Sequence, residues 1–152
     1  MKIKDGTTPT ANELEVRFGD GNLTYSRKRN IEYNLDRGVL DAVREGDDVP
    51  LEVSFEGMWD FVTAESGEPP TIIDALEKTG EASSWVSSDD DQCQPYAVNL
   101  EVEYNPGCSG VQKELIVFPD FRFDSYDPDL RAGQIAVKGK CNVVKPTVTR
   151  TA

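Results

Sequence analysis

The side chains best suited to catalysis are scarce in this chain. It contains no histidine, which rules out Ser-His-Asp and Cys-His nucleophiles and every zinc site that needs a histidine. Glycine-rich phosphate loops and the GxSxG motif are also absent. Acids are abundant, with 28 Asp and Glu against 16 Lys and Arg, so a carboxylate pair at glycosidase spacing is expected by chance alone. We therefore predict that the protein is not an enzyme and uses no cofactor.

Two acidic segments and three cysteines are the remaining candidates for a metal or a reactive group. Residues 124–129 resemble a calcium loop, but they lack its regular acid spacing and its Glu at the twelfth position. We interpret these acids, and those at 89–91, as caps of turns. Cys93, Cys108 and Cys141 form no CxxC pair and are interpreted as small buried thiols, with a disulfide or a metal as the alternative. The sequence thus predicts no metal site.

Charge and hydropathy narrow the class of protein. The net charge is −12, which opposes binding to nucleic acid because phosphate contacts need Lys and Arg. One basic cluster, at residues 27–29, is interpreted as a solvated strand face or a subunit contact, with a phosphate site as the minor alternative. No apolar run approaches the ~20 residues of a membrane helix, and the first residues do not resemble a signal peptide. We therefore expect synthesis in the cytoplasm.

Apolar residues alternate with polar ones along most of the chain, which is typical of half-buried strands. The segments with this pattern are 14–18, 23–35, 51–62, 96–104, 114–118, 121–126 and 133–144. Residues 14–35 are predicted as a hairpin around a turn at 19–22, and Gly57 is predicted to mark a bulge or a bend. The fold class is therefore mainly β, an antiparallel β-sandwich or partial barrel of seven or eight strands.

The rest of the chain is predicted to be one short helix, a connection and two arms. Residues 69–80 form the helix, with Thr71 as its cap, Asp74 at the third helical position and Gly80 at its end. Residues 36–50 break the alternation and are either a short helix or a long connection. Residues 1–11 and 145–152 read as flexible arms around a single domain at 12–144.

In the order of these segments and in their residue patterns, the chain resembles the major tail tube proteins of long, flexible-tailed bacteriophages. The resemblance covers most of the chain. Its segments are LEVRFGDGNLTYSRKRNIEYNLDRG, VREGDDVPLEVSFEGMWDFV, PPTIIDALEKTG and FPDFRFDSYDPDLRAGQIAVKGKCNV. It implies a β-sandwich with the helix on its flank. Six copies would form a ring with a continuous inner barrel, and the rings would stack into a hollow tube.

The resemblance also implies partners and a location. The chain would bind itself, a tape-measure protein inside the tube, and tail tip and terminator proteins at the ends. It would reside in the virion, where genome DNA passes without specific binding through a lumen lined by acids. Ring stacking would use the two arms and the segment 36–50. Its charged residues, the candidate site, are Asp36, Arg37, Asp41, Arg44, Glu45, Asp47 and Asp48.

Two other classes of function remain open at this point. One is a β-sandwich that binds carbohydrate or protein, for which exposed aromatics such as Trp59 or Trp85 would be the mark. The other is a different virion part, such as a tail terminator or a head decoration protein. The tube hypothesis makes a distinct prediction, since deletion of residues 41–48 should leave the fold intact and stop stacking.

Overall fold

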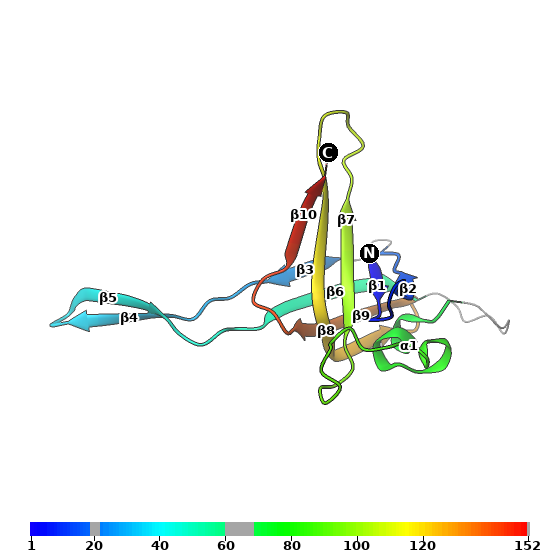
Figure 1. Ribbon diagram of the computed structural model, residues 1–152, viewed down its shortest axis with the longest axis horizontal. Helices are drawn as coiled ribbons and strands as arrows, with labels where there is room; N and C mark the ends of the chain where they lie inside the picture. Colours follow the sequence, from blue (N-terminus) through cyan, green and yellow to red (C-terminus); the bar gives the residue numbers. More distant parts are fainter. Residues whose placement is uncertain (19–21, 60–68, 152) are drawn as a thin grey trace.

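The protein is dominated by one antiparallel sheet, described here from a computed structural model for residues 1–18, 22–59 and 69–151. The sheet has eight strands in the order β2-β1-β7-β8-β9-β6-β3, with β10 also paired to β8 (Figure 1). A second sheet contains only β4 and β5. The strands are β1 (Lys2–Lys4), β2 (Glu13–Glu15), β3 (Leu23–Ser26), β4 (Ile31–Asp36), β5 (Val39–Glu45), β6 (Leu51–Met58), β7 (Val98–Tyr104), β8 (Lys113–Asp129), β9 (Gln134–Cys141) and β10 (Thr147–Thr151). The mainly β, antiparallel fold class is confirmed.

The large sheet curls so that its two ends approach each other. Arg17, just beyond edge strand β2, accepts a hydrogen bond through its carbonyl from the Met58 N–H at the end of β6 (2.7 Å). The curled sheet encloses the core, and its central strands supply the most deeply buried side chains. These are Leu51, Val53 and Phe55 of β6, Val98 and Leu100 of β7, Phe118 and Phe121 of β8, and Ile135, Val137 and Cys141 of β9. The alternation predicted for β6, β7 and β9 therefore matches the buried positions.

One short helix, α1 (Ile72–Glu77), packs on this barrel. Thr71 caps it as predicted, since its hydroxyl accepts from the Asp74 N–H and the Asp74 carboxylate accepts from the Thr71 N–H. The helix ends at Lys78 in the left-handed conformation, and not at Gly80. The predicted bulge at Gly57 is wrong, because β6 stays in register there with β9. Glycine leaves room here for neighbouring side chains, since a Cβ would lie 2.8 Å from the Val16 Cγ1 and 2.9 Å from the Ile72 Cδ1 of α1.

Strand β8 is one long bent strand, where two separate strands at 114–118 and 121–126 were predicted. The bend is a bulge, because Pro119 and Asp120 together oppose the single residue Asn99 of β7. Proline has no N–H to donate to a ladder and fits such a position. The Asn99 side chain accepts the Asp120 N–H (3.1 Å), which replaces the lost ladder bond. The break in alternation therefore marks a bend within β8.

The predicted hairpin at residues 14–35 is wrong. Strand β2 pairs with β1, while β3 pairs with β6, so the two strands do not pair with each other. The alternation at 23–35 is itself divided, since β3 ends at Ser26 and β4 begins at Ile31 in the other sheet. Residues 19–21 of the predicted turn and 60–62 of the predicted strand lie outside the described residues.

Both predicted flexible arms contribute strands. In β1, Ile3 is completely buried between Leu14 of β2 and Leu100 of β7, so the expectation of an arm at 1–11 is wrong for this part. Strand β10, within the predicted tail at 145–152, pairs with the first five residues of β8. All five residues of β10 are exposed, so backbone pairing holds it in place without the burial that alternation detects.

The Asp5 carboxylate fixes the segment that follows β1. It is only 2% exposed, and its oxygens accept five hydrogen bonds: from the N–H and hydroxyl of Thr7, the N–H and side-chain amide of Asn12, and the N–H of Val86. Burial by itself raises the pKa of Asp5, but these hydrogen bonds outweigh burial and hold the pKa below its ordinary 3.8. The ionised carboxylate therefore ties β1 to the loop at Val86.

We expect Asp5→Asn to lower the free energy of unfolding by about 2–4 kcal/mol at pH 7, because an amide NH₂ would face donors where an oxygen now accepts. A depressed pKa stabilises the fold above pH 3.8, and this stabilisation is lost as the pH falls through the folded-state pKa. Urea unfolding should therefore show the deficit at pH 7 and a smaller one at pH 3. The exposed Asp90→Asn is the control. Equal stability of the two variants at pH 7 would contradict the role given to Asp5.

Candidate assembly surface

Strands β4 and β5 form a hairpin that extends away from the barrel along the longest axis of the molecule (Figure 1). Its turn is Arg37 and Gly38, both with positive φ (52° and 82°), flanked by the pair Asp36 and Val39. Positive φ at both positions is the two-residue type I′ turn, whose twist suits a hairpin. Segment 36–50 is therefore neither a helix nor a long connection, and its first ten residues complete a hairpin with β4.

One face of this hairpin is apolar and open. Tyr33 lies opposite Val43, and Leu35 lies opposite Leu40. Cross-strand partners point to the same side of a sheet, as do residues two apart on one strand. We call these four residues the hairpin face. They are 61%, 60%, 62% and 65% exposed, in the order just given. A two-stranded hairpin is at best marginally stable alone in water, so a face of this kind needs a covering partner.

The opposite face of the hairpin is mostly polar. It carries Glu32 and Arg44, which form an ion pair, the pair Asn34 and Ala42, and the pair Asp36 and Val39 beside the turn, in which Val39 is exposed. Asp41 is the extra residue of a bulge, since Asn34 pairs with Ala42 and Leu35 with Leu40. One hairpin thus has an apolar face and a polar face, which is the pattern of an element that contacts a partner on one side and water on the other.

The seven predicted site residues all lie on or beside this hairpin. Asp36 ends β4, Arg37 is in the turn, Asp41, Arg44 and Glu45 are in β5, and Asp47 and Asp48 follow β5. The structure pairs Arg44 with Glu32 and Glu45 with Arg29 (3.5 Å). The prediction did not include the apolar residues of the hairpin face. Their signal in the sequence is the alternation of Tyr33 and Leu35, which predicts a half-buried strand.

The basic cluster at residues 27–29 forms the base of the hairpin. The Arg27 Nε donates to the Val144 carbonyl (3.2 Å), Lys28 pairs with Glu52 (3.1 Å), and Arg29 pairs with Glu45. The Gly46 N–H also donates to the Asn30 carbonyl (2.7 Å), which closes the two chains of the base. Each basic side chain has a partner within the chain. Lys28 connects the base of the hairpin to β6 and Arg27 connects it to the segment after β9, whereas Arg29 pairs with β5 of the hairpin itself.

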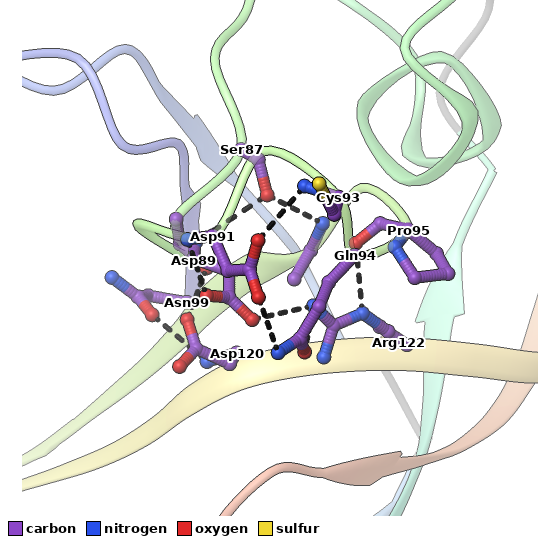
Figure 2. Close-up of polar contacts among 11 residues, drawn as sticks. Ser87, Asp89, Asp91, Cys93, Gln94, Pro95, Asn99, Asp120 and Arg122 are labelled. Atoms are coloured by element: carbon purple, nitrogen blue, oxygen red, sulfur yellow. Dashed lines mark hydrogen bonds and ion pairs between the residues drawn. The ribbon is translucent and has the colours of Figure 1, made fainter.

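The most connected polar cluster joins the acidic loop at 87–97 to β8 (Figure 2). Arg122 donates to the Asp89 carboxylate (2.7 Å) and to the Pro95 carbonyl (2.8 Å). Asp91 accepts from the Cys93 N–H (2.9 Å), as expected for an acid that caps a turn. Within the described part of the chain, no group of three or more His, Cys, Asp or Glu is placed to hold a metal ion. The cluster therefore fastens a loop and offers no ligand set.

The three cysteines and two tryptophans lie in different environments. Cys141 is a buried thiol as predicted, and its burial, with the charge of Asp120, raises its pKa to about 12. Cys93 and Cys108 are exposed, so the same interpretation is wrong for them. Trp85 is buried and Trp59 packs partly buried against the core. Neither tryptophan therefore supplies the open aromatic platform that a carbohydrate-binding face would need.

Three comparisons with known proteins found no match. No family model, no curated protein and no solved structure matches the chain. In the ranges that the structure describes, no helix is both long and apolar enough to cross a membrane.

Proposed function

We propose that the chain is a structural subunit that assembles with copies of itself, and that the assembly is a hollow tail tube of the kind found in long-tailed bacteriophages. One observation carries the proposal. A hairpin projects from the curled sheet and exposes the four apolar side chains of the hairpin face. Covering these side chains would be worth about 1.5–3 kcal/mol for each of the larger ones. A neighbouring subunit provides that cover in every copy of a closed ring.

The charge of the chain supports the same proposal. A conduit for DNA must repel phosphate, and a subunit of net charge −12 provides the required sign if acids line the lumen. In this proposal six copies form each ring, rings stack, and genome DNA passes through without specific binding. A tape-measure protein inside the tube, and tip and terminator proteins at its ends, are the other partners.

Assembly of the purified protein tests the proposal. We expect negative-stain electron microscopy over a concentration series to show rings with a central hole or hollow tubes. Light scattering should give a ring mass of six times the 16.8 kDa subunit. A monomer at every concentration up to the solubility limit would contradict self-assembly. Compact particles without a hole would contradict the tube and favour another kind of virion part.

A further inference from the structure

A second apolar surface lies where the core face of the large sheet continues beyond its cover. Leu100 of β7 lies opposite Phe118 of β8, and both are buried in the core. The ring of Tyr25 from β3 packs on Phe118 with centroids 5.3 Å apart. Strands β7 and β8 then run on past the barrel together with β10 (Figure 1). The same face of the sheet therefore continues beyond Phe118, where its side chains are only partly buried or exposed.

The residues on this continued face become more exposed with distance from the core. Val102 lies opposite Ile116, which in turn lies opposite Val148 of β10, and Tyr104 follows Val102 two positions later. Val102 and Ile116 are half-buried, whereas Tyr104 and Val148 are 62% and 42% exposed. We call these four residues the upper sheet face. The other large exposed apolar residues outside the hairpin, such as Met58 and Leu130, belong to different strands and turns.

The hairpin face and the upper sheet face match in size. Each face has two neighbouring cross-strand rows: Tyr33–Val43 and Leu35–Leu40 on the hairpin, and Val102–Ile116–Val148 followed by Tyr104 on the sheet. The two rows of each face are two residues apart on one strand, about 7 Å at roughly 3.3 Å for each residue. The hairpin points away from β7, β8 and β10 within one chain, so it does not cover the upper sheet face of its own molecule (Figure 1). Two open sheet faces of similar length pack in the way that the layers of a β-sandwich do.

Their charges are complementary as well. Residues 31–45 carry four acids and two arginines, a net charge of −2. The three segments that form the upper sheet face, 102–104, 113–118 and 145–151, carry three bases and two acids, a net charge of +1 within a chain of −12. The bases are Lys113, Lys145 and Arg150, and the acids are Glu103 and Glu114. Glu114 lies opposite Tyr104 and is paired with Arg150 (3.2 Å). A hairpin of net charge −2 is attracted more by this surface than by a second hairpin of the same negative charge.

We propose that the hairpin face of one copy packs on the upper sheet face of a second copy. This inference rests on the proposed function, because it names the surface that receives the hairpin. The contact joins two different patches, so each copy both gives a hairpin and receives one. Such heterologous contacts generate a ring when the rotation between copies closes and a helical filament when it does not.

A disulfide between copies tests the contact directly. In a background of Cys93→Ser and Cys108→Ser, one preparation carries Leu40→Cys and another carries Val148→Cys. The two are mixed under assembling conditions and oxidised, so a cross-link can form only between different chains. We expect a disulfide-linked dimer on a non-reducing gel, at least tenfold more abundant than with the control mixture of Ala42→Cys and Val148→Cys. Ala42 lies on the polar face of the same hairpin.

The outcomes separate this inference from the proposed function. If rings or tubes form and the Leu40 mixture cross-links no more than the Ala42 mixture, the contact is wrong and self-assembly stands. If the protein stays monomeric under every condition, both are wrong. As a second measurement, Val148→Asp should raise the concentration needed for assembly at least tenfold with an unchanged circular dichroism spectrum. Assembly at the wild-type concentration would overturn the contact.

Discussion

Introducing two aspartates on the hairpin face, Leu35→Asp together with Leu40→Asp, is expected to abolish self-assembly. The two leucines are cross-strand partners and both are more than 60% exposed. Burial of two leucines in an interface is worth about 3–6 kcal/mol, and a buried unpaired charge adds a further cost. The concentration needed for assembly should therefore rise by at least about 100-fold. Light scattering against concentration measures this shift.

The chain offers a matched control for this pair. Asn34 and Ala42 are also cross-strand partners, one residue along on the polar face of the same hairpin. Like the leucine double variant, Asn34→Asp with Ala42→Asp places two negative charges directly opposite each other. The two double variants should therefore lower the stability of the hairpin by similar amounts. This control should assemble within about threefold of the wild-type concentration. If both double variants fail equally, hairpin stability decides assembly and the apolar face has no special role.

The pairing within the hairpin also corrects the deletion proposed from sequence. Removal of residues 41–48 would take away most of β5 and leave β4 without its partner. Such a variant would expose an unpaired strand in addition to losing any contact with a neighbour. The paired substitutions on one face therefore give the cleaner test, because they leave both strands in place.

Alternation predicted which residues are buried better than it predicted which strands pair. The pattern along Leu51, Val53 and Phe55 fixes the side of β6 that faces the core. This alternation does not indicate which strand pairs with β6, however, because any strand with an apolar face can pack its side chains on the same core. Sequence proximity then suggested that β2 and β3 pair, whereas β1 lies beside β2 and β6 lies beside β3. Strands β2 and β3 instead lie at opposite ends of the strand order of the large sheet.

The strands that were not predicted, β1 and β10, have too few buried side chains to show an alternation of apolar and polar residues. Strand β10 has five exposed residues, and β1 has a single buried residue, Ile3, between two lysines. The hairpin was missed for a different reason. Its turn uses Arg37 before Gly38 at a position where Asn or Asp is the usual signal. The alternation of Tyr33 and Leu35 predicted a half-buried strand, because sequence cannot distinguish a face buried in the chain from one left open for a partner.

The substitution Gly139→Ala is expected to lower the free energy of unfolding by about 3 kcal/mol or more. Gly139 lies in β9, between Val53 of β6 and Phe123 of β8. A Cβ at this position would lie 2.2 Å from the Arg122 carbonyl oxygen and 2.7 Å from the Phe121 ring. The first contact is with backbone in the middle of the sheet, which cannot move without breaking the ladder, and the second is with a core side chain.

Thermal unfolding of Gly139→Ala measures this cost, and a loss of about 3 kcal/mol corresponds to a fall in Tm of roughly 6–12 °C for a chain of this size. Lys138→Val is the control, because Lys138 is exposed on the same strand and valine suits a strand surface. It should change stability by no more than about 0.5 kcal/mol. A Tm for Gly139→Ala within 2 °C of wild type would mean that β8 and β9 can separate at this point. Such a result would contradict the role given to Gly139, which is to leave room for the Arg122 carbonyl and the Phe121 ring.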